Sequence, residues 1–277
     1  MKLAYPVLVL LLGCSPQPTR LDEAAAGSPP ATGRPTTPDD RIARLERRLD
    51  KVATALDKAL GPAEPDPAAI YALPLDDQDP IEGPRAAKVT IVEGYDFLCP
   101  YCVMANPVID QIRAKYPDDV RVVSKYLVVH GTPAATAGTY ACAAAKQGKF
   151  TEMKTALWSR LWKTENGRPA AHPEEVGKID ELAATLGLDP ARLATDVDGC
   201  KQWLQSGERT LTAVGVHGTP AFFINGRPQR DRSFEAFDRT IAQELAKANR
   251  SSVAAADYYD REIVAKGLTQ VKGRFAD

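Results

Sequence analysis

The stretch Cys99-Pro100-Tyr101-Cys102 holds two thiols separated by two residues. It follows an apolar, β-branched run, Val89-Thr90-Ile91-Val92, and precedes a helix-like run from Val103 to Tyr116. Two thiols at such a junction indicate either a redox pair or half of a metal site. A metal site needs four ligands, and the chain has no second C-x-x-C pair and only three scattered histidines, His130, His172 and His217. We therefore predict a redox pair and no metal.

The two cysteines have unequal positions on the predicted helix. Cys99 lies at its start, where unpaired backbone N–H groups and the helix dipole stabilise an anion. Cys102 lies one turn inside and is shielded. Because a thiol attacks only as the thiolate, Cys99 is predicted to form the mixed disulfide and Cys102 to resolve it. Pro100 supplies a helix-compatible φ, and Tyr101 is expected to be half exposed.

The N-terminus has the pattern of an export signal. The apolar run Leu3 to Leu12 follows a positive start, is too short to span a bilayer and fits a secretory signal peptide. Leu11-Leu12-Gly13-Cys14 resembles the bacterial lipoprotein box, which implies a signal peptide over residues 1–13 and an acylated Cys14. In that family Ser15 after the cysteine favours the outer membrane. The alternative is an ordinary signal peptide, or a short anchor, with an incidental cysteine.

Cys142 and Cys200 are the two cysteines left among the five. An oxidising periplasm permits a disulfide between them, and the alternative is two unrelated buried thiols. A bridge would close a loop of about 58 residues, worth roughly 4 kcal/mol in the chain-entropy model.

The composition excludes some classes of partner. The net charge is −1, and no basic run is interleaved with aromatic residues, so we predict no nucleic-acid partner. A hydrophobic content of 44% with 26% charged residues is typical of a globular protein.

Two segments precede the predicted domain. Residues 14–38 are rich in Pro, Gly, Ser and Thr and are expected to form a disordered tether. Residues 39–61 are predicted to form a coiled-coil-like helix, because apolar residues alternate at spacings of three and four: Ile42, Leu45, Leu49, Val52, Leu56 and Ala59. A lone helix of this length is marginal in water, so the stripe needs a partner. That partner is either a second copy of the chain, through residues 40–60, or a groove on its own domain.

The remaining chain is predicted to be a mixed α/β domain over residues 70–250. Two buried parallel strands, 88–95 and 120–129, flank the helix that begins at the cysteine pair. Residues 133–214 show no strand-like run and are expected to be entirely helical. A short strand at 221–224 precedes the turn Asn225-Gly226, and a helix follows from Ser233 to Ala248. Ile70 to Leu75 are expected to form a strand, residues 76–85 a polar turn, and 251–277 a C-terminal helical extension.

Two motifs together resemble one known family. The first is Glu93 through Asp96-Phe97-Leu98-Cys99-Pro100-Tyr101-Cys102, and the second is Gly218-Thr219-Pro220-Ala221-Phe222-Phe223-Ile224-Asn225-Gly226. Both are similar to those of the thioredoxin superfamily, and more narrowly to DsbA-like thiol–disulfide oxidoreductases of the bacterial periplasm. The resemblance implies a thioredoxin fold with an inserted helical domain at 133–214.

The resemblance also implies roles for single residues. Pro220 is expected to be cis and to face the Cys99 sulfur, and the backbone of Thr219 to pair with an extended substrate strand. Glu93 matches a buried acid that assists proton transfer to and from Cys102; the alternative is a surface acid at a strand edge. Some relatives carry a structural disulfide where Cys142 and Cys200 lie.

Two further residues bear on the direction of electron flow. Tyr101 stands where strongly oxidising members have histidine, and tyrosine adds no positive charge beside the thiolate. His217, three residues before Pro220, is a candidate for stabilising the Cys99 thiolate, against the alternative of a surface histidine.

These observations predict a lipid-anchored periplasmic enzyme, without a cofactor, that oxidises thiols of exported proteins and is reoxidised by a quinone-linked membrane protein. The alternative is an isomerase or reductase of the same fold, kept reduced by a membrane electron donor. A chaperone-like module without turnover is the third hypothesis, and the intact cysteine pair argues against it.

Overall fold

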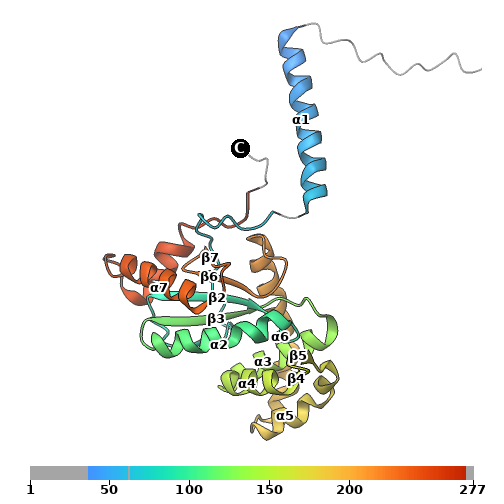
Figure 1. Ribbon diagram of the computed structural model, residues 1–277, viewed down its shortest axis with the longest axis vertical. Coiled ribbons are helices and arrows are strands. Elements are labelled where there is room, and N and C mark those ends of the chain that lie inside the picture. Colours follow the sequence, from blue (N-terminus) through green and yellow to red (C-terminus); the bar gives the residue numbers. More distant parts are fainter. Residues whose placement is uncertain (1–36, 62, 273–277) are drawn as a thin grey trace, which may run out of the picture. The chain divides into compact units, whose positions relative to one another are not determined.

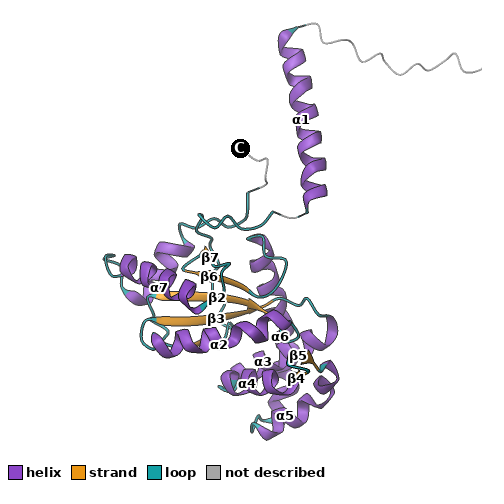
Figure 2. Cartoon of the chain, viewed as in Figure 1, coloured by secondary structure: helices purple, strands orange, loops and turns teal. Residues whose placement is uncertain are grey.

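The computed structural model describes residues 37–61 and 63–272 (Figures 1 and 2). The predicted signal peptide, Cys14 and most of the predicted tether lie outside the described residues. Helix α1 (Pro38–Leu60) belongs to an N-terminal unit up to Thr54 and continues into a larger unit that begins at Ala55. No helix within the described residues is long and apolar enough to cross a membrane.

Five strands form the central sheet, in the order β1-β3-β2-β6-β7. Their bounds are β1 Ile81–Glu82, β2 Val89–Tyr95, β3 Val120–Tyr126, β6 Ala221–Ile224 and β7 Arg227–Pro228. Strands β2 and β3 run parallel, as predicted for a β-α-β unit, whereas β1 and β6 pair antiparallel with β3 and β2. Both central strands are buried along their whole length, as expected for strands covered on both faces. Their apolar runs are interrupted by buried polar residues, Glu93 on β2 and Arg121, Ser124 and Lys125 on β3.

Helices cover both faces of this sheet. Helices α2 (Pro100–Lys115) and α7 (Phe234–Ala248) pack on one face, where Ile109 and Phe237 meet Ile91 and Val122. The C-terminal part of α6 (Pro190–Ala213) lies on the opposite face, with Leu211 against Val123. Burial from both sides fixes the position of the strand ends that carry the active-site loops.

Residues 131–213 form the inserted helical part, which Figure 1 shows grouped on one side of the sheet. Its elements are α3 (Gly131–Lys146), α4 (Phe150–Leu161), the 3₁₀ helix η1 (Pro173–Lys178), α5 (Ile179–Thr185) and α6. Its core holds the Cys142–Cys200 disulfide, whose Cα atoms are 5.9 Å apart and whose cysteines are fully buried. The bridge joins α3 to α6.

The prediction that this part contains no strand is wrong. A hairpin of β4 (Trp162–Glu165) and β5 (Arg168–Ala171) follows α4. Its turn is Asn166-Gly167, with φ angles of 50° and 75°, the left-handed conformation that this dipeptide favours. The strands are exposed apart from the buried Trp162 and the half-buried Ala170, so they lack the apolar alternation that marks a buried strand.

The strand expected at Ile70 to Leu75 is also absent, because only Tyr71 forms a bridge, to Leu268. The edge strand β1 lies instead inside the segment expected to be a polar turn, residues 76–85. Residues 70–75 are held by the C-terminal extension, which contains α8 (Ala255–Tyr258) and the π-helix η2 (Tyr259–Val264). The Leu268 N–H donates to Ile70 O (2.9 Å), and the Tyr259 hydroxyl donates to Leu73 O (3.0 Å). The extension therefore completes the core beneath the sheet.

Candidate active site

The cysteine pair lies where β2 gives way to α2. Cys99 is the N-cap of α2, with extended backbone angles, and Pro100 is the first helical residue. Both cysteines are free, and they are buried: Cys99 is 3% exposed and Cys102 is 0% exposed. Tyr101 between them is 58% exposed. The first turn thus presents one sulfur at the end of the helix and encloses the other.

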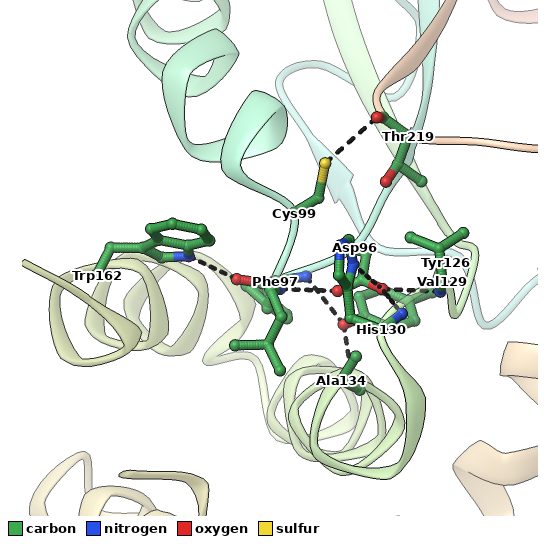
Figure 3. Close-up of polar contacts among 10 residues, drawn as sticks. Asp96, Phe97, Cys99, Tyr126, Val129, His130, Ala134, Trp162 and Thr219 are labelled. Atoms are coloured by element: carbon green, nitrogen blue, oxygen red, sulfur yellow. Dashed lines mark hydrogen bonds and ion pairs between the residues drawn. The ribbon is translucent and has the colours of Figure 1, made fainter. Parts of the chain in front are cut away.

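The loop before β6, which follows the inserted helical part in the sequence, also lies beside the cysteine pair. The peptide bond between Thr219 and Pro220 is cis. The Cys99 thiol donates to the Thr219 carbonyl oxygen at 3.2 Å, as Figure 3 shows. The Thr219 hydroxyl is buried and has no hydrogen-bond partner within residues 37–61 and 63–272. A donor beside the sulfurs is therefore left free to serve a thiolate.

The surroundings give the two sulfurs opposite acidities. Hydrogen bonding to the Cys102 thiol lowers the pKa of Cys99 to about 5, with further help from Thr219 and the backbone of Tyr101 and Cys102 and against the effect of burial. Burial, followed by the neighbouring Cys99 sulfur, raises the pKa of Cys102 far above its ordinary value. At neutral pH Cys99 is thus a thiolate and Cys102 a thiol, the assignment that the helix position predicts.

Asp96 anchors the loop that leads into the cysteine pair. Its carboxylate is fully buried and accepts hydrogen bonds from the backbone N–H groups of Leu98 (2.7 Å), Val129 (2.8 Å) and His130 (3.0 Å). The His130 ring nitrogen Nδ1 lies 3.2 Å from the same carboxylate (Figure 3). One side chain therefore ties the loop after β2 to the loop after β3.

Phe97 is held through its backbone by the helical insertion (Figure 3). Its N–H donates to the Tyr126 hydroxyl (3.0 Å), which donates to Ala134 O (2.8 Å), and its carbonyl accepts from Trp162 Nε1 (2.7 Å). Helix α3 approaches Tyr126 closely, since a Cβ at Gly138 would lie 2.6 Å from the tyrosine ring. The insertion thus sets the position of the residue two before Cys99.

Glu93 is 1% exposed, which contradicts the alternative of a surface acid. It shares the buried Lys154 ammonium group (Nζ–Oε2 3.3 Å) with Glu82 (3.0 Å), and Glu82 also pairs with Arg113 (2.9 Å). Burial raises the pKa of Glu93 despite the lysine, whereas Lys154 and Arg113 lower the pKa of Glu82 despite its burial. The more easily protonated carboxyl is thus the one on β2, the strand that leads to Cys99.

The structure does not bring His217 to the thiolate. His217 is exposed, and the groups that shift the pKa of Cys99 are Cys102, Thr219 and Tyr101. His217 lines instead a cavity of about 620 Å³ beside the cis-proline loop, together with Gly218, Pro220, Arg230 and Arg232. Within the described residues no group of three His, Cys, Asp or Glu side chains is arranged to hold a metal ion.

Sequence reasoning missed Asp96, Tyr126, Trp162 and Lys154 as supports of the site. Lys154 had a visible signal, because it lies on the buried face of α4 with Phe150, Leu157 and Trp158. A lysine in an apolar stripe indicates a buried anionic partner. Trp162 and Tyr126 gave no such signal, since aromatic residues at the end of a predicted helix or inside a predicted strand are ordinary core residues.

A family model described as Thioredoxin matches residues 76–243. Two curated relatives are a Na(+)/H(+) antiporter NhaA of Herminiimonas arsenicoxydans, 36% identical over 179 residues, and NhaA 3 of Salinispora tropica, 32% identical over 247 residues. These matches cover 63% and 82% of this chain but 26% and 34% of the antiporters, so the chain spans about a quarter to a third of their length. These two partial matches are no evidence that this chain transports ions.

Solved structures share the fold. BdbD from Bacillus subtilis has a TM-score of 0.55 at 20% identity, covering 64% of this chain and 98% of that chain. A thioredoxin-like oxidoreductase from Silicibacter pomeroyi has 0.52 at 24% identity, covering 62% and 94%. ScsC from Proteus mirabilis, in a transitional conformation, has 0.52 at 20% identity, covering 76% and 88%. The chain therefore belongs to the thioredoxin family, and its fold is that of the DsbA-like thiol–disulfide oxidoreductases.

Proposed function

We propose that this protein oxidises pairs of thiols in exported proteins by exchange with a Cys99–Cys102 disulfide. The observation that carries the proposal is the low pKa of Cys99, about 5, beside a Cys102 whose pKa is raised. A thiolate that is stable in the reduced protein favours reduction of the disulfide, and this makes the disulfide a strong oxidant. The same thiolate is the better leaving group when the substrate disulfide forms.

The reaction transfers two electrons in two exchanges. A substrate thiolate attacks the Cys99 sulfur, the Cys99–Cys102 bond breaks, and Cys102 leaves and takes a proton because its pKa is high. A second substrate thiolate then attacks the substrate sulfur of the mixed disulfide and releases the Cys99 thiolate. The substrate is oxidised, the protein is reduced, and a quinone-linked membrane protein restores the disulfide.

Glu93 is the group on this chain suited to handle the proton of Cys102. Its raised pKa keeps a carboxyl group protonated to higher pH than usual, and Lys154 holds it in place at 3.3 Å. A buried acid of this kind delivers the proton as Cys102 leaves and accepts it again on reoxidation.

The backbone of Thr219 is the site at which an extended substrate segment pairs. Its carbonyl lies 3.2 Å from the Cys99 sulfur, so a chain that pairs with this backbone brings its own cysteine to the same sulfur. The absence of sequence-specific contacts in such main-chain pairing suits many substrates.

A second function, isomerase or reductase, is favoured by one observation. Tyr101 is exposed and stands close to Arg232, but it adds no charge of its own beside the thiolate. For this two-electron couple about 30 mV corresponds to 1.4 kcal/mol, so the loss of one interaction shifts the direction appreciably. In that case a membrane electron donor keeps the pair reduced.

We also propose that the protein acts in the bacterial periplasm, anchored by a lipid on Cys14, with the outer membrane favoured. The support is the sequence Leu11-Leu12-Gly13-Cys14-Ser15. Replacing Cys14 by Ser should move the protein from the membrane fraction to the soluble fraction. Retention of the Cys14→Ser protein in membranes would remove the support for lipid anchoring.

The exchange reaction is tested with oxidised protein and a reduced, unfolded substrate that has several cysteines. We expect wild-type protein to consume substrate thiols and Cys99→Ala to consume none. Reduced Cys102→Ala, given instead a substrate that carries a disulfide, should accumulate a mixed disulfide at Cys99 and release one substrate thiol, because no second cysteine resolves it. Gel electrophoresis without reductant separates this mixed disulfide. Full activity of Cys99→Ala would sink the enzymatic proposal and favour a binding module.

A further inference from the structure

Two arginines, Arg230 and Arg232, line the cavity beside the cis-proline loop. Arg230 donates to Pro65 O (3.0 Å) and forms an ion pair with Glu64 (3.0 Å), so its charge is matched. Arg232 donates to Pro220 O (3.3 Å), and its guanidinium lies 5.9 Å from the centre of the Tyr101 ring. Arg232 therefore contacts both halves of the site, the cis-proline loop and the residue between the cysteines.

Among the residues that the structure describes, Arg232 has no anionic partner. No carboxylate within residues 37–61 and 63–272 forms an ion pair with it. Its neighbour Asp231 directs its carboxylate to the Ser233 N–H (2.9 Å), at the start of α7. A guanidinium has five N–H donors, and the contact with Pro220 uses one of them. The group is thus fixed in position, exposed and able to bind an anion.

We propose that Arg232 is a specificity-determining residue, and that the cavity beside Pro220 takes an extended peptide segment with a carboxylate side chain close to its cysteine. The inference rests on the proposed function. The Cys99 sulfur faces the carbonyl of Thr219, and Arg232 holds the carbonyl of the next residue (Figure 3 shows the first contact). A substrate cysteine at Cys99 therefore places its neighbouring side chains within reach of the guanidinium, which binds carboxylates with two N–H groups.

The first test uses reduced peptides with two cysteines that differ only in the residues beside one cysteine, which are Glu, Gln or Lys. Oxidised wild-type protein should oxidise the Glu peptide about threefold faster than the Gln peptide at low ionic strength, and the Lys peptide more slowly, because exposed ion pairs are worth a few-fold. Arg232→Gln should bring the Glu-to-Gln ratio to about one. Arg250→Gln, which removes the same charge from an exposed residue at the end of α7, should keep the wild-type ratio.

A second readout does not depend on exchange with peptides. Reduced protein is alkylated at Cys99 with iodoacetate, which is anionic, or iodoacetamide, which is neutral. Arg232→Gln should lower the iodoacetate-to-iodoacetamide rate ratio about threefold, and Arg250→Gln should leave this ratio at its wild-type value. High salt should reduce the difference between wild type and Arg232→Gln.

Peptide oxidation and Cys99 alkylation test the proposed function and the role of Arg232 separately. If the protein oxidises no peptide at all, the proposed function fails, and the alkylation ratio still decides whether Arg232 recruits anions to Cys99. If Arg232→Gln and wild type give the same alkylation ratio, or the same Glu-to-Gln preference, the assignment of Arg232 is overturned.

Discussion

At the scale of single residues, the site depends on a difference in pKa between two cysteine thiols. Cys99 and Cys102 are separated by two residues and share one helical turn, yet the first has a pKa of about 5 and the second a raised one. Hydrogen bonds that converge on Cys99 and burial of Cys102 produce the difference. Because the thiolate is the reactive form, the first prediction concerns its titration.

Alkylation of the reduced protein should follow a single thiolate with a midpoint near pH 5, at Cys99 only. Removing the hydrogen bond from the Cys102 thiol with Cys102→Ala should move this midpoint upwards. Mass spectrometry of iodoacetamide-treated protein over a range of pH measures both. A wild-type midpoint near 9.0, the ordinary pKa of cysteine, would contradict the account.

Stability of the reduced protein should depend on the same group. The folded pKa of about 5 is below the ordinary value of 9.0, so the unfolded chain binds more protons between these values. The stabilising contribution of the Cys99 thiolate is therefore complete above pH 9, decreases as the pH falls, and is lost below pH 5. Cys99→Ala should flatten this part of the stability profile, as urea unfolding of the two reduced proteins can measure.

Lys154 is expected to matter for folding as well as for the proton. Lys154→Met leaves the buried Glu93 and Glu82 without their shared cation, and losing one partner of a buried pair costs about 3–5 kcal/mol. The loss in the free energy of unfolding should be smaller at acid pH, where Glu93 is protonated. Adding Glu93→Gln to Lys154→Met should restore part of the stability at neutral pH. A cost below about 1 kcal/mol at neutral pH would show that the cluster is not a stabilising unit.

At the scale of elements, α1 is a helix with an unburied apolar stripe. Leu49 is 67% exposed, Val52 63% and Leu45 56%. We propose that a second copy covers this stripe, because the flanking charges match a parallel pair. Arg41 and Glu46 occupy positions that face each other between parallel helices with this repeat.

Leu49→Asp should abolish the oligomer. The measurement is sedimentation equilibrium of a protein that begins at residue 37, at micromolar concentration. Thr54→Asp introduces the same charge on the opposite face of the helix and should leave the oligomer intact. A wild-type monomer under these conditions would contradict the proposal and favour a groove on the protein's own domain.

The Cys142–Cys200 disulfide between α3 and α6 is distinct from the Cys99–Cys102 pair. Cys142 and Cys200 are 58 residues apart, so replacing both by Ala should lower the free energy of unfolding by about 4 kcal/mol. The alkylation midpoint of Cys99 should not change, because the groups that lower its pKa are Cys102, Thr219 and the backbone of Tyr101 and Cys102. Urea unfolding and the alkylation assay together test this, and an unchanged midpoint with unchanged stability would refute the structural role.

At the scale of the whole molecule, the active site joins segments that the insertion separates. Thr219 contacts Cys99 across 120 residues of sequence, and Trp162 contacts Phe97 across 65. The sequence predicts the local parts of this arrangement, since Cys99-Pro100 begins a helix and Asn225-Gly226 makes a turn through their own chemistry. The Thr219-Pro220 motif predicts the opposing loop only through its resemblance to a family.

The parts that sequence did not predict depend on contacts between distant segments. Glu93 needs Lys154 on α4 to be stable inside the protein, and nothing near Glu93 in the sequence shows this. Residues 70–75 lack strand partners because the C-terminal extension holds them, which no local pattern reveals. The β4–β5 turn was visible as Asn166-Gly167, but its exposed strands lacked the apolar pattern.

The direction of electron flow is also a property of the whole molecule. It is set by the reduction potential of the cysteine pair, which depends on the relative stabilities of the oxidised and reduced forms. Equilibration of the Cys99–Cys102 pair in glutathione buffers of known potential measures it directly. The low pKa of Cys99 predicts a value near about −120 mV, the strongly oxidising end of the family. A value near about −270 mV, where thioredoxin lies, would contradict the proposal that this protein is an oxidase.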